Sequence, residues 1–289
     1  MAAQSPARWL SCYFFWKSMG NTGIVGVFDS GIGGITVLSE LVQFLPEYSF
    51  IYFADTENCP YGSKSQTEII HLSHKIVEFL IQKGAEVVVV ACNTATASAI
   101  DYLRENFRIP FVGMEPAIKP AALATKTKSV GVLATAGTFN GRLYKETSKK
   151  YAGNIKVNYQ IGEGLVELVE QQQSRSPKAK KLLEKYIKPM LDDDIDHLVL
   201  GCTHYPFFIP LLKNILPKSV AIINPAPAVA KQARRIVQKT ICPNEHLESS
   251  IDFFSSGDIK ILQQIVLEEG LFESPLKFNT NFSGNVSLR

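Results

Sequence analysis

The sequence predicts an α/β fold in which two similar parallel-sheet domains face each other across a cleft. Short apolar, β-branched runs alternate with stretches whose apolar residues recur at helical spacing. Strands that alternate with helices form parallel sheets covered by helices on both faces. Two segments, 87–94 and 197–204, resemble each other, since each combines an apolar strand pattern with a cysteine and small polar residues. A chain of 289 residues is long enough to bury two cores.

The run of four valines at 87–90 is typical of a strand that is covered on both faces. The apolar spacing of 65–83 predicts a helix that ends at Gly84, and the helix predicted at 35–45 ends before Pro46. We expect the other strands at 24–28, 50–54, 111–112, 129–133, 197–200, 221–223 and 251–254, a loop at 134–138, and further helices at 165–173 and 178–190.

These elements divide the chain into two expected domains and an extension. The first domain comprises residues 23–115 together with 225–289, and the second comprises 116–224. We expect residues 1–22 to be a disordered extension, or the product of a start upstream of the true one near Met19. The apolar segment 7–16 is too short to span a bilayer.

Composition excludes several classes of function. A net charge of +3, with 20% charged residues, provides no general nucleic-acid surface. No segment is long and apolar enough to predict a membrane partner. The five cysteines include no Cys-x-x-Cys pair, which argues against a disulfide framework or a structural zinc site and favours a reducing cytoplasm.

Cys92 and Cys202 each follow a predicted buried strand and precede small polar residues. Backbone N–H groups and the positive end of a following helix would favour the thiolate at such a position. A single cysteine in this context is usually a small buried apolar residue. Two matched cysteines from facing domains instead indicate acid–base groups on opposite faces of one substrate, the layout that racemisation requires.

Several residues near these cysteines allow two interpretations. Asp29 and Ser30 follow the first strand, where they would cap a helix or contribute to a site. The stretch Gly31 to Gly34 departs from a dinucleotide fingerprint, because Thr36 occupies the position of the last glycine. His204 could tune a thiol, hold a carboxylate or be a satisfied core histidine.

The histidines and cysteines do not indicate a metal site. A zinc site formed by Cys92, Cys202 and His204 would have no fourth ligand at a familiar spacing, so we expect no metal. His71 and His74 are expected on an exposed helix face.

Five segments resemble, in the same order along the chain, the motifs of glutamate racemases. The resemblance runs from about residue 24 to 260, and five matches in register make a chance resemblance improbable. The segments are 28–34, 54–56 with 60–65, 91–95, 201–206 and 253–258.

This resemblance implies a two-domain fold of the aspartate/glutamate racemase type. It implies cofactor-independent interconversion of L- and D-glutamate, which supplies D-glutamate for peptidoglycan in the cytoplasm. Members of the family are monomers or dimers, and some are regulated by a cell-wall precursor; the sequence leaves a homodimer and such regulation open.

The resemblance also implies roles for individual residues. Cys92 and Cys202 would be the two acid–base thiols, assisted by Asp29 and His204 respectively. Glu170 would support His204, with Glu167 as the alternative, because the usual Cys-Pro pair upstream is replaced by residues 162–163. The expected substrate-binding residues are Asp29, Ser30, Pro60, Tyr61, Gly62, Cys92, Asn93, Thr94, Cys202, Thr203 and His204.

One departure from the family pattern introduces a further thiol. Cys59 stands where a small apolar residue is more common, which suggests a third thiol near the mouth of the site.

Other functions remain as alternatives. An aspartate or hydantoin racemase would use the same scaffold, whereas a related decarboxylase needs only one cysteine. A non-catalytic small-molecule or protein-binding module would leave two poised thiols as an unexplained oxidation hazard.

Overall fold

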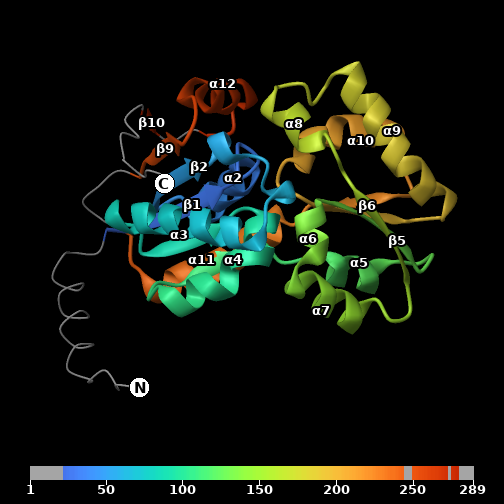
Figure 1. Ribbon diagram of the computed structural model, residues 1–289, viewed down its shortest axis with the longest axis horizontal. Helices are drawn as coiled ribbons and strands as arrows, with labels where there is room; N and C mark the ends of the chain where they lie inside the picture. Colours follow the sequence, from blue (N-terminus) through green and yellow to red (C-terminus); the bar gives the residue numbers. More distant parts are fainter. Residues whose placement is uncertain (1–21, 244–248, 273–274, 280–289) are drawn as a thin grey trace.

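The computed structural model describes residues 22–243, 249–272 and 275–279, which form an α/β fold with two parallel sheets. The predicted fold class is therefore confirmed. The expected extension lies outside the described residues, except for Thr22. Figure 1 shows the two sheets side by side, with β1 and β2 in one and β5 and β6 in the other. Among the residues in these ranges, no helix combines the length and apolar composition needed to cross a bilayer.

The larger sheet has six strands in the order β10-β9-β2-β1-β3-β4, and every pairing is parallel. Its strands come from both ends of the described chain. They are β1 (Ile24–Asp29), β2 (Ser49–Ala54), β3 (Val87–Val90), β4 (Phe111–Gly113), β9 (Ile251–Ser255) and β10 (Leu276–Phe278).

The smaller sheet has four parallel strands in the order β6-β5-β7-β8. All four come from the middle of the chain. They are β5 (Ser129–Ala134), β6 (Lys156–Ile161), β7 (His197–Gly201) and β8 (Ala221–Ile223).

Helices cover both faces of the larger sheet because its strands bury side chains on both sides. Val25 and Val27 of β1 point to a core shared with α2 (Ile35–Phe44) and α11 (Ala226–Thr240). Phe28 lies on the opposite face, with α3 (Gln66–Gln82) and α4 (Asn93–Asn106). Alternation along a strand sends successive side chains to opposite faces, which explains this division.

The smaller sheet is also covered on both sides. One core includes Val130, Val132 and residues of α5 (Ile118–Ala124) and α7 (Arg142–Tyr151). The other face of the smaller sheet packs against three helices. Their apolar side chains belong to the same core as those of α2 and α11, so this core extends from one sheet to the other. These helices are α8 (Leu165–Glu170), α9 (Pro177–Asp192) and α10 (Ile209–Ile215), and α12 (Ile259–Glu269) packs on the larger sheet.

Most predicted elements are present with small shifts in their bounds. The loop expected at 134–138 is wrong in part, because Thr135 caps a short helix, α6 (Ala136–Asn140), by accepting a hydrogen bond from the backbone of Thr138. The helix predicted at 165–173 ends at Glu170. The strand β6 was not predicted, since it is a half-exposed edge strand that carries polar residues.

The prediction of an exposed face for His71 and His74 holds only for His71. His74 is partly buried, and its Nδ1 lies 3.3 Å from the hydroxyl of Tyr102. Its ring also contacts Phe107 on the adjacent segment. His74 is therefore a packing residue between α3 and α4.

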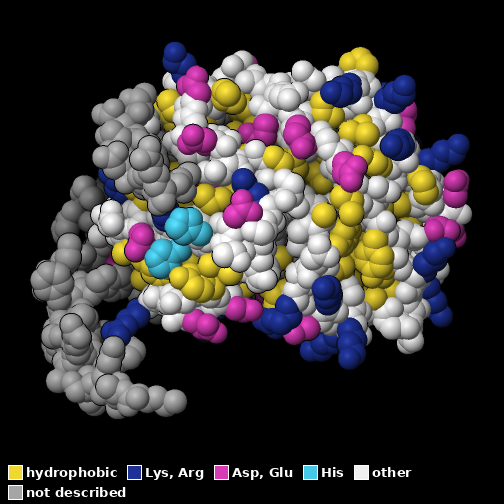
Figure 2. Space-filling view, in the orientation of Figure 1, with side chains coloured by type: hydrophobic (Ala, Val, Ile, Leu, Met, Phe, Trp, Pro, Cys, Tyr) yellow, Lys and Arg dark blue, Asp and Glu magenta, His cyan; other side chains and the backbone are white. Residues whose placement is uncertain are grey.

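The surface shows charges of both signs. Figure 2 shows Lys and Arg side chains interspersed with Asp and Glu on this face, without a continuous basic area. Yellow side chains gather over the region of β5 and β6, where Tyr159 and Ile161 of the edge strand are exposed.

Helix α3 begins directly after the loop that carries Tyr61, and a capping box defines its first turn. The Ser65 hydroxyl accepts a hydrogen bond from the backbone of Glu68, whose carboxylate accepts one from the backbone of Ser65. This reciprocal pair satisfies two helix-end donors.

We therefore expect Ser65→Ala to lower the free energy of unfolding by about 1 kcal/mol, as loss of an N-cap oxygen usually does. Urea-induced unfolding of the purified protein measures this change. Ser65→Thr is the control, because it keeps the capping hydroxyl. Equal stability of the alanine variant and the wild type would contradict this interpretation.

Candidate active site

The carboxyl ends of β1, β2, β3 and β7 bring the candidate residues together. Asp29 ends β1, and Asp55 directly follows β2. Cys92 and Cys202 follow β3 and β7 in the same way. Parallel sheets place ligands beyond the carboxyl ends of their strands, so the two cysteines stand where a substrate would bind.

Cys92 is the N-cap of α4 and is almost fully buried. Its Sγ donates to Ser30 Oγ at 3.5 Å and accepts from the backbone N–H of Ala95 at 3.4 Å. Burial and the nearby charge of Asp29 nevertheless raise the pKa of the Cys92 thiol. The backbone N–H of Ala95, at the helix end, lowers the Cys92 pKa as expected, but burial outweighs this effect and the net shift is upward.

Asp29 is fully buried between the two cysteines' loops, and it does not cap a helix. The interpretation of Asp29 and Ser30 as a helix cap is wrong, since α2 begins after Gly34. One carboxylate oxygen accepts from the backbone of Ser30 at 2.6 Å, and the other accepts from Thr203 Oγ1 at 3.0 Å. Burial raises the pKa of Asp29, although the charge of His204 opposes this effect.

Cys202 lies beside an imidazole. Its Sγ is 3.7 Å from Nδ1 of His204, and Nε2 of the same ring is 2.6 Å from Oε1 of Glu170. Burial alone would lower the pKa of His204, but hydrogen bonds to Cys202, Cys59 and Glu170 outweigh it and hold that pKa well above its usual value. These hydrogen bonds therefore favour the imidazolium form of the ring.

Glu170 is the carboxylate that contacts His204, whereas Glu167 is exposed. Burial would raise the pKa of Glu170, but its hydrogen bonds to His204 and to the backbone of Ile32 lower it overall. The backbone N–H of Ile32 donates to Glu170 Oε1 at 2.8 Å. The opposite shifts of the two pKa values agree with a buried, charged pair.

The glycines that follow β1 make room for this pair. A Cβ at Gly31 would lie 2.0 Å from Glu170 Oε1, and one at Gly33 would lie 2.4 Å from Nδ1 of His204. The glycine-rich stretch therefore allows Glu170 and His204 to pack closely against the backbone after β1. This role differs from that of a phosphate-binding loop.

Tyr61 is held by a network that joins two sequence motifs. Its hydroxyl donates to Asp55 Oδ2 at 2.5 Å, and the Ser256 hydroxyl donates to Asp55 Oδ1 at 2.7 Å. Thr56 and Ser255 form a second link at 2.7 Å between the same two segments. The motif at 253–258 therefore supports the loop that carries Pro60, Tyr61 and Gly62.

Thr94 and Thr135 link the two sheets near the site. Their hydroxyl oxygens are 2.8 Å apart, and Thr135 also lies against Gly62. Asn93, at the start of α4, is buried, and its Oδ1 has no hydrogen-bond partner among the described residues. An unpartnered buried acceptor beside Cys92 is available to a bound ligand.

Cys59 is a third thiol in this group. Its Sγ lies 3.6 Å from Glu170 Oε1, next to a cis peptide bond that joins it to Pro60. Burial raises the pKa of Cys59 to about 12. Cys59, Glu170 and His204 together offer three ligand types within 4.8 Å of one another.

Hydrogen bonds connect the predicted residues in two main clusters: one joins Cys92, Ser30, Asp29 and Thr203, and the other joins Cys202, His204 and Glu170. Pro60, Tyr61 and Gly62 belong to the adjoining loop. Sequence reasoning did not assign roles to Asp55, Thr135 or Ser256. Asp55 and Ser256 lie inside recognised motifs, whereas Thr135 lay in a segment that was expected to be a loop.

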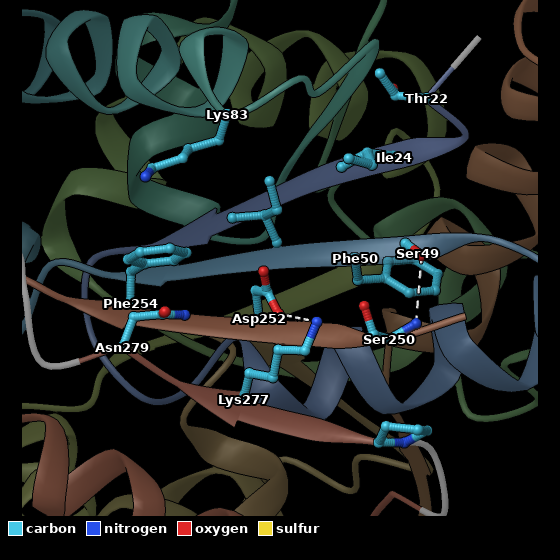
Figure 3. A pocket seen from close by; sticks show the side chains of 12 residues that line it. Thr22, Ile24, Ser49, Phe50, Lys83, Ser250, Asp252, Phe254, Lys277 and Asn279 are labelled. Carbon is cyan, nitrogen blue, oxygen red and sulfur yellow. Dashed lines mark hydrogen bonds and ion pairs between the residues drawn. The ribbon is translucent and has the colours of Figure 1, made fainter. Parts of the chain in front are cut away.

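A separate cavity of about 390 Å³ lies near the amino ends of β1 and β2, away from both cysteines. Figure 3 shows Lys277 of β10 near Asp252 of β9, with Lys83 on the other side. Lys277 Nζ and Asp252 Oδ1 are 4.0 Å apart. The lining residues include no cysteine or histidine, so this cavity offers no thiol chemistry.

Comparisons with known proteins agree with this geometry. The family model Asp/Glu/Hydantoin racemase matches residues 33–233. A glutamate racemase of Herpetosiphon aurantiacus is 44% identical over 235 residues, which cover 81% of this chain and 92% of the relative.

Solved structures give the same result. Glutamate racemase RacE1 of Bacillus anthracis superposes with a TM-score of 0.79 at 32% identity, covering 89% of this chain and 97% of that one. Escherichia coli glutamate racemase, in complex with L-glutamate and the activator UDP-MurNAc-Ala, superposes with a TM-score of 0.78 at 29% identity, covering 88% and 97%. With its paired cysteines at matching strand ends, this chain belongs to the Asp/Glu/Hydantoin racemase family.

Proposed function

We propose that this protein interconverts L- and D-glutamate, with Cys92 and Cys202 acting on opposite faces of the substrate Cα. The observation that carries the proposal is the pairing of each buried thiol with its own acid–base group. The Ser30 hydroxyl links Cys92 to Asp29, at 3.5 Å from the Cys92 sulfur and 3.2 Å from the Asp29 carboxylate, and Nδ1 of His204 lies 3.7 Å from the Cys202 sulfur. The similarity to glutamate racemases over most of the chain supports glutamate as the substrate.

The first half-reaction uses the carboxylate side of the site. Asp29, whose pKa is raised by burial, takes the proton of Cys92, and the resulting thiolate removes the α-proton of one enantiomer. The backbone N–H groups of Asn93 and Thr94, at the start of α4, have no acceptors within the helix, so they can stabilise the negative charge that develops on the α-carboxylate.

The second half-reaction uses the imidazolium side. The Cys202 thiol donates its proton to the opposite face of Cα, and His204 returns a proton to the sulfur. The reverse reaction starts from the Cys202 thiolate, which the neighbouring imidazolium stabilises. Glu170 orients the His204 ring throughout and favours its return to the imidazolium after each proton transfer.

The unpartnered Oδ1 of Asn93 is suited to the α-ammonium group of the substrate. We assign the remaining contacts to the residues that surround the two thiols. They are Asp29, Ser30, Pro60, Tyr61, Gly62, Thr94, Thr203 and His204.

We also propose that the product D-glutamate enters peptidoglycan synthesis in the cytoplasm. The four described cysteines are all free, which fits a reducing compartment. We propose that residues 23–115 with 225–289, and residues 116–224, act as two domains that close on the substrate. A homodimer and regulation by a cell-wall precursor stay predictions, the latter supported by the activator bound to the Escherichia coli structure.

We expect Cys92→Ala and Cys202→Ala each to lower the rate of racemisation by about 10²- to 10⁴-fold or more, the usual contribution of one acid–base group. Circular dichroism follows the inversion of glutamate. Each variant retains one thiol, so we expect exchange of the α-proton of one enantiomer to persist.

Aspartate, assayed in parallel, distinguishes the sister activity. Equal racemisation by the wild type and Cys92→Ala would rule out the two-thiol scheme. Tight ligand binding without exchange by the wild type would instead indicate a binding module.

We expect Glu170→Gln to lower kcat/KM by about 10- to 100-fold, the cost of one hydrogen bond to a charged group. The imidazolium of His204 persists below its folded-state pKa and is lost as the pH rises through that value. Because Glu170 helps to raise this pKa, its removal shifts the alkaline limb of the pH profile to lower pH.

Glu167→Gln is the matched control, since Glu167 is exposed on the same helix. We expect its pH profile to equal that of the wild type. An unchanged alkaline limb in Glu170→Gln would contradict the role assigned to the ion pair.

We expect Asn93→Ala to raise KM about tenfold, with a smaller effect on kcat, because a uniform binding contact is lost. Initial rates over a range of glutamate concentrations separate the two constants. A fall in kcat at unchanged KM would assign Asn93 to the chemical step instead.

A further inference from the structure

The side chains of Cys59, Glu170 and His204 come from three separate segments and contact one another. This group includes neither of the acid–base thiols, Cys92 and Cys202. Cys59 follows β2, Glu170 ends α8, and His204 lies in the loop after β7. One thiol sulfur, one carboxylate oxygen and one ring nitrogen lie within 4.8 Å of one another. The mechanism proposed above uses Glu170 and His204 but leaves Cys59 without a role.

The Cys59–Glu170 spacing fits a tetrahedral metal ion, and the His204–Glu170 spacing needs a small adjustment to do so. Zinc binds sulfur at about 2.3 Å and nitrogen or oxygen at about 2.0–2.2 Å, so the ligand atoms of a tetrahedral site lie about 3.4–3.6 Å apart. Cys59 Sγ and Glu170 Oε1 are 3.6 Å apart. The 2.6 Å hydrogen bond between Glu170 and His204 would open by about 0.8 Å as the ion replaces its proton.

The environment also suits a soft divalent cation. Thiolate, imidazole and carboxylate together are the ligands that zinc prefers, and three protein ligands leave a fourth position for water. The side chain of His204 is only 2% exposed, whereas that of Glu170 is 19% exposed and Cys59 is partly exposed. The His204 side of the group is therefore shielded from solvent, whereas an ion from solvent can reach the Glu170 and Cys59 side.

We propose that Cys59, Glu170 and His204 form an inhibitory site for a soft divalent cation, with Zn²⁺ as the best fit. The ion displaces the Cys59 thiol proton and the proton shared by His204 and Glu170, and both protons pass to solvent. Bound metal takes Nε2, the nitrogen that otherwise faces Glu170, and leaves a neutral ring whose remaining N–H, on Nδ1, is a weaker acid than the imidazolium. His204 therefore returns a proton to Cys202 less readily. The inhibitory consequence rests on the proposed racemase function, whereas metal binding does not.

Binding is tested on the full chain after treatment with a chelator, with Co²⁺ as a spectroscopic substitute for Zn²⁺. We expect the wild type to bind Co²⁺ with a thiolate-to-metal charge-transfer band. Cys59→Ser should lose this band and bind at least about tenfold more weakly, as loss of a ligand predicts. Cys242→Ser is the matched control, because Cys242 is an exposed free thiol elsewhere on the surface.

Activity provides the second readout. We expect Zn²⁺ to inhibit the wild type reversibly, with activity restored by the chelator. Measured against its own metal-free activity, Cys59→Ser should need at least about tenfold more Zn²⁺ for the same fractional inhibition. Cys59→Ala should behave in the same way, and circular dichroism confirms that both variants are folded.

Two outcomes would overturn the proposal. Equal inhibition of the wild type and Cys59→Ser by Zn²⁺ would show that the inhibition does not depend on Cys59. A charge-transfer band that persists in Cys59→Ser would exclude Cys59 as a ligand. A Cys59-dependent band in a protein that does not racemise glutamate would instead support the metal site and overturn the proposed function.

Discussion

The buried ion pair between His204 and Glu170 joins parts of the chain that are far apart in sequence. Glu170 ends a helix beside the smaller sheet, and its carboxylate accepts a hydrogen bond from the backbone of Ile32, in the loop that follows β1 of the larger sheet. The glycines of that loop allow the carboxylate and the imidazole to approach the backbone. A buried charged pair is stable only when its polar atoms are hydrogen-bonded. Here the imidazole and the carboxylate bond to each other, and the loop N–H donates to the carboxylate.

This pair gives the two thiols different surroundings. Cys92 lies beside a buried carboxylate, whereas Cys202 lies beside an imidazolium. Asp29 and His204 are linked through Thr203, whose hydroxyl donates to Asp29. Environments that separate the pKa values of neighbouring groups allow one site to supply both an acid and a base. The proposed mechanism uses this difference to remove a proton on one face of a carbon atom and deliver one on the other.

Much of this arrangement could be predicted from the sequence. Continuous apolar runs predict the buried strands β3 and β7. The small polar residues that follow each run mark the strand end where the cysteine stands. Glu170 could be chosen over Glu167 only by resemblance, because both lie in one apolar-patterned helix and only the three-dimensional packing selects the inward one. The raised pKa of Cys92 depends on burial, which a single sequence does not quantify. The link from Asp55 to Ser256 spans 201 positions and arises from the pairing of β2 with β9.

The proposed mechanism assigns two different thiols to the two faces of the substrate. Mass spectrometry of L-glutamate incubated with the enzyme in D₂O, stopped at low conversion, tests this claim directly. Because a different group delivers the new proton, the D-glutamate product should carry deuterium at Cα while the recovered L-glutamate stays unlabelled. Early deuterium in the recovered L-glutamate at the level found in the product would indicate one exchanging base and contradict the account.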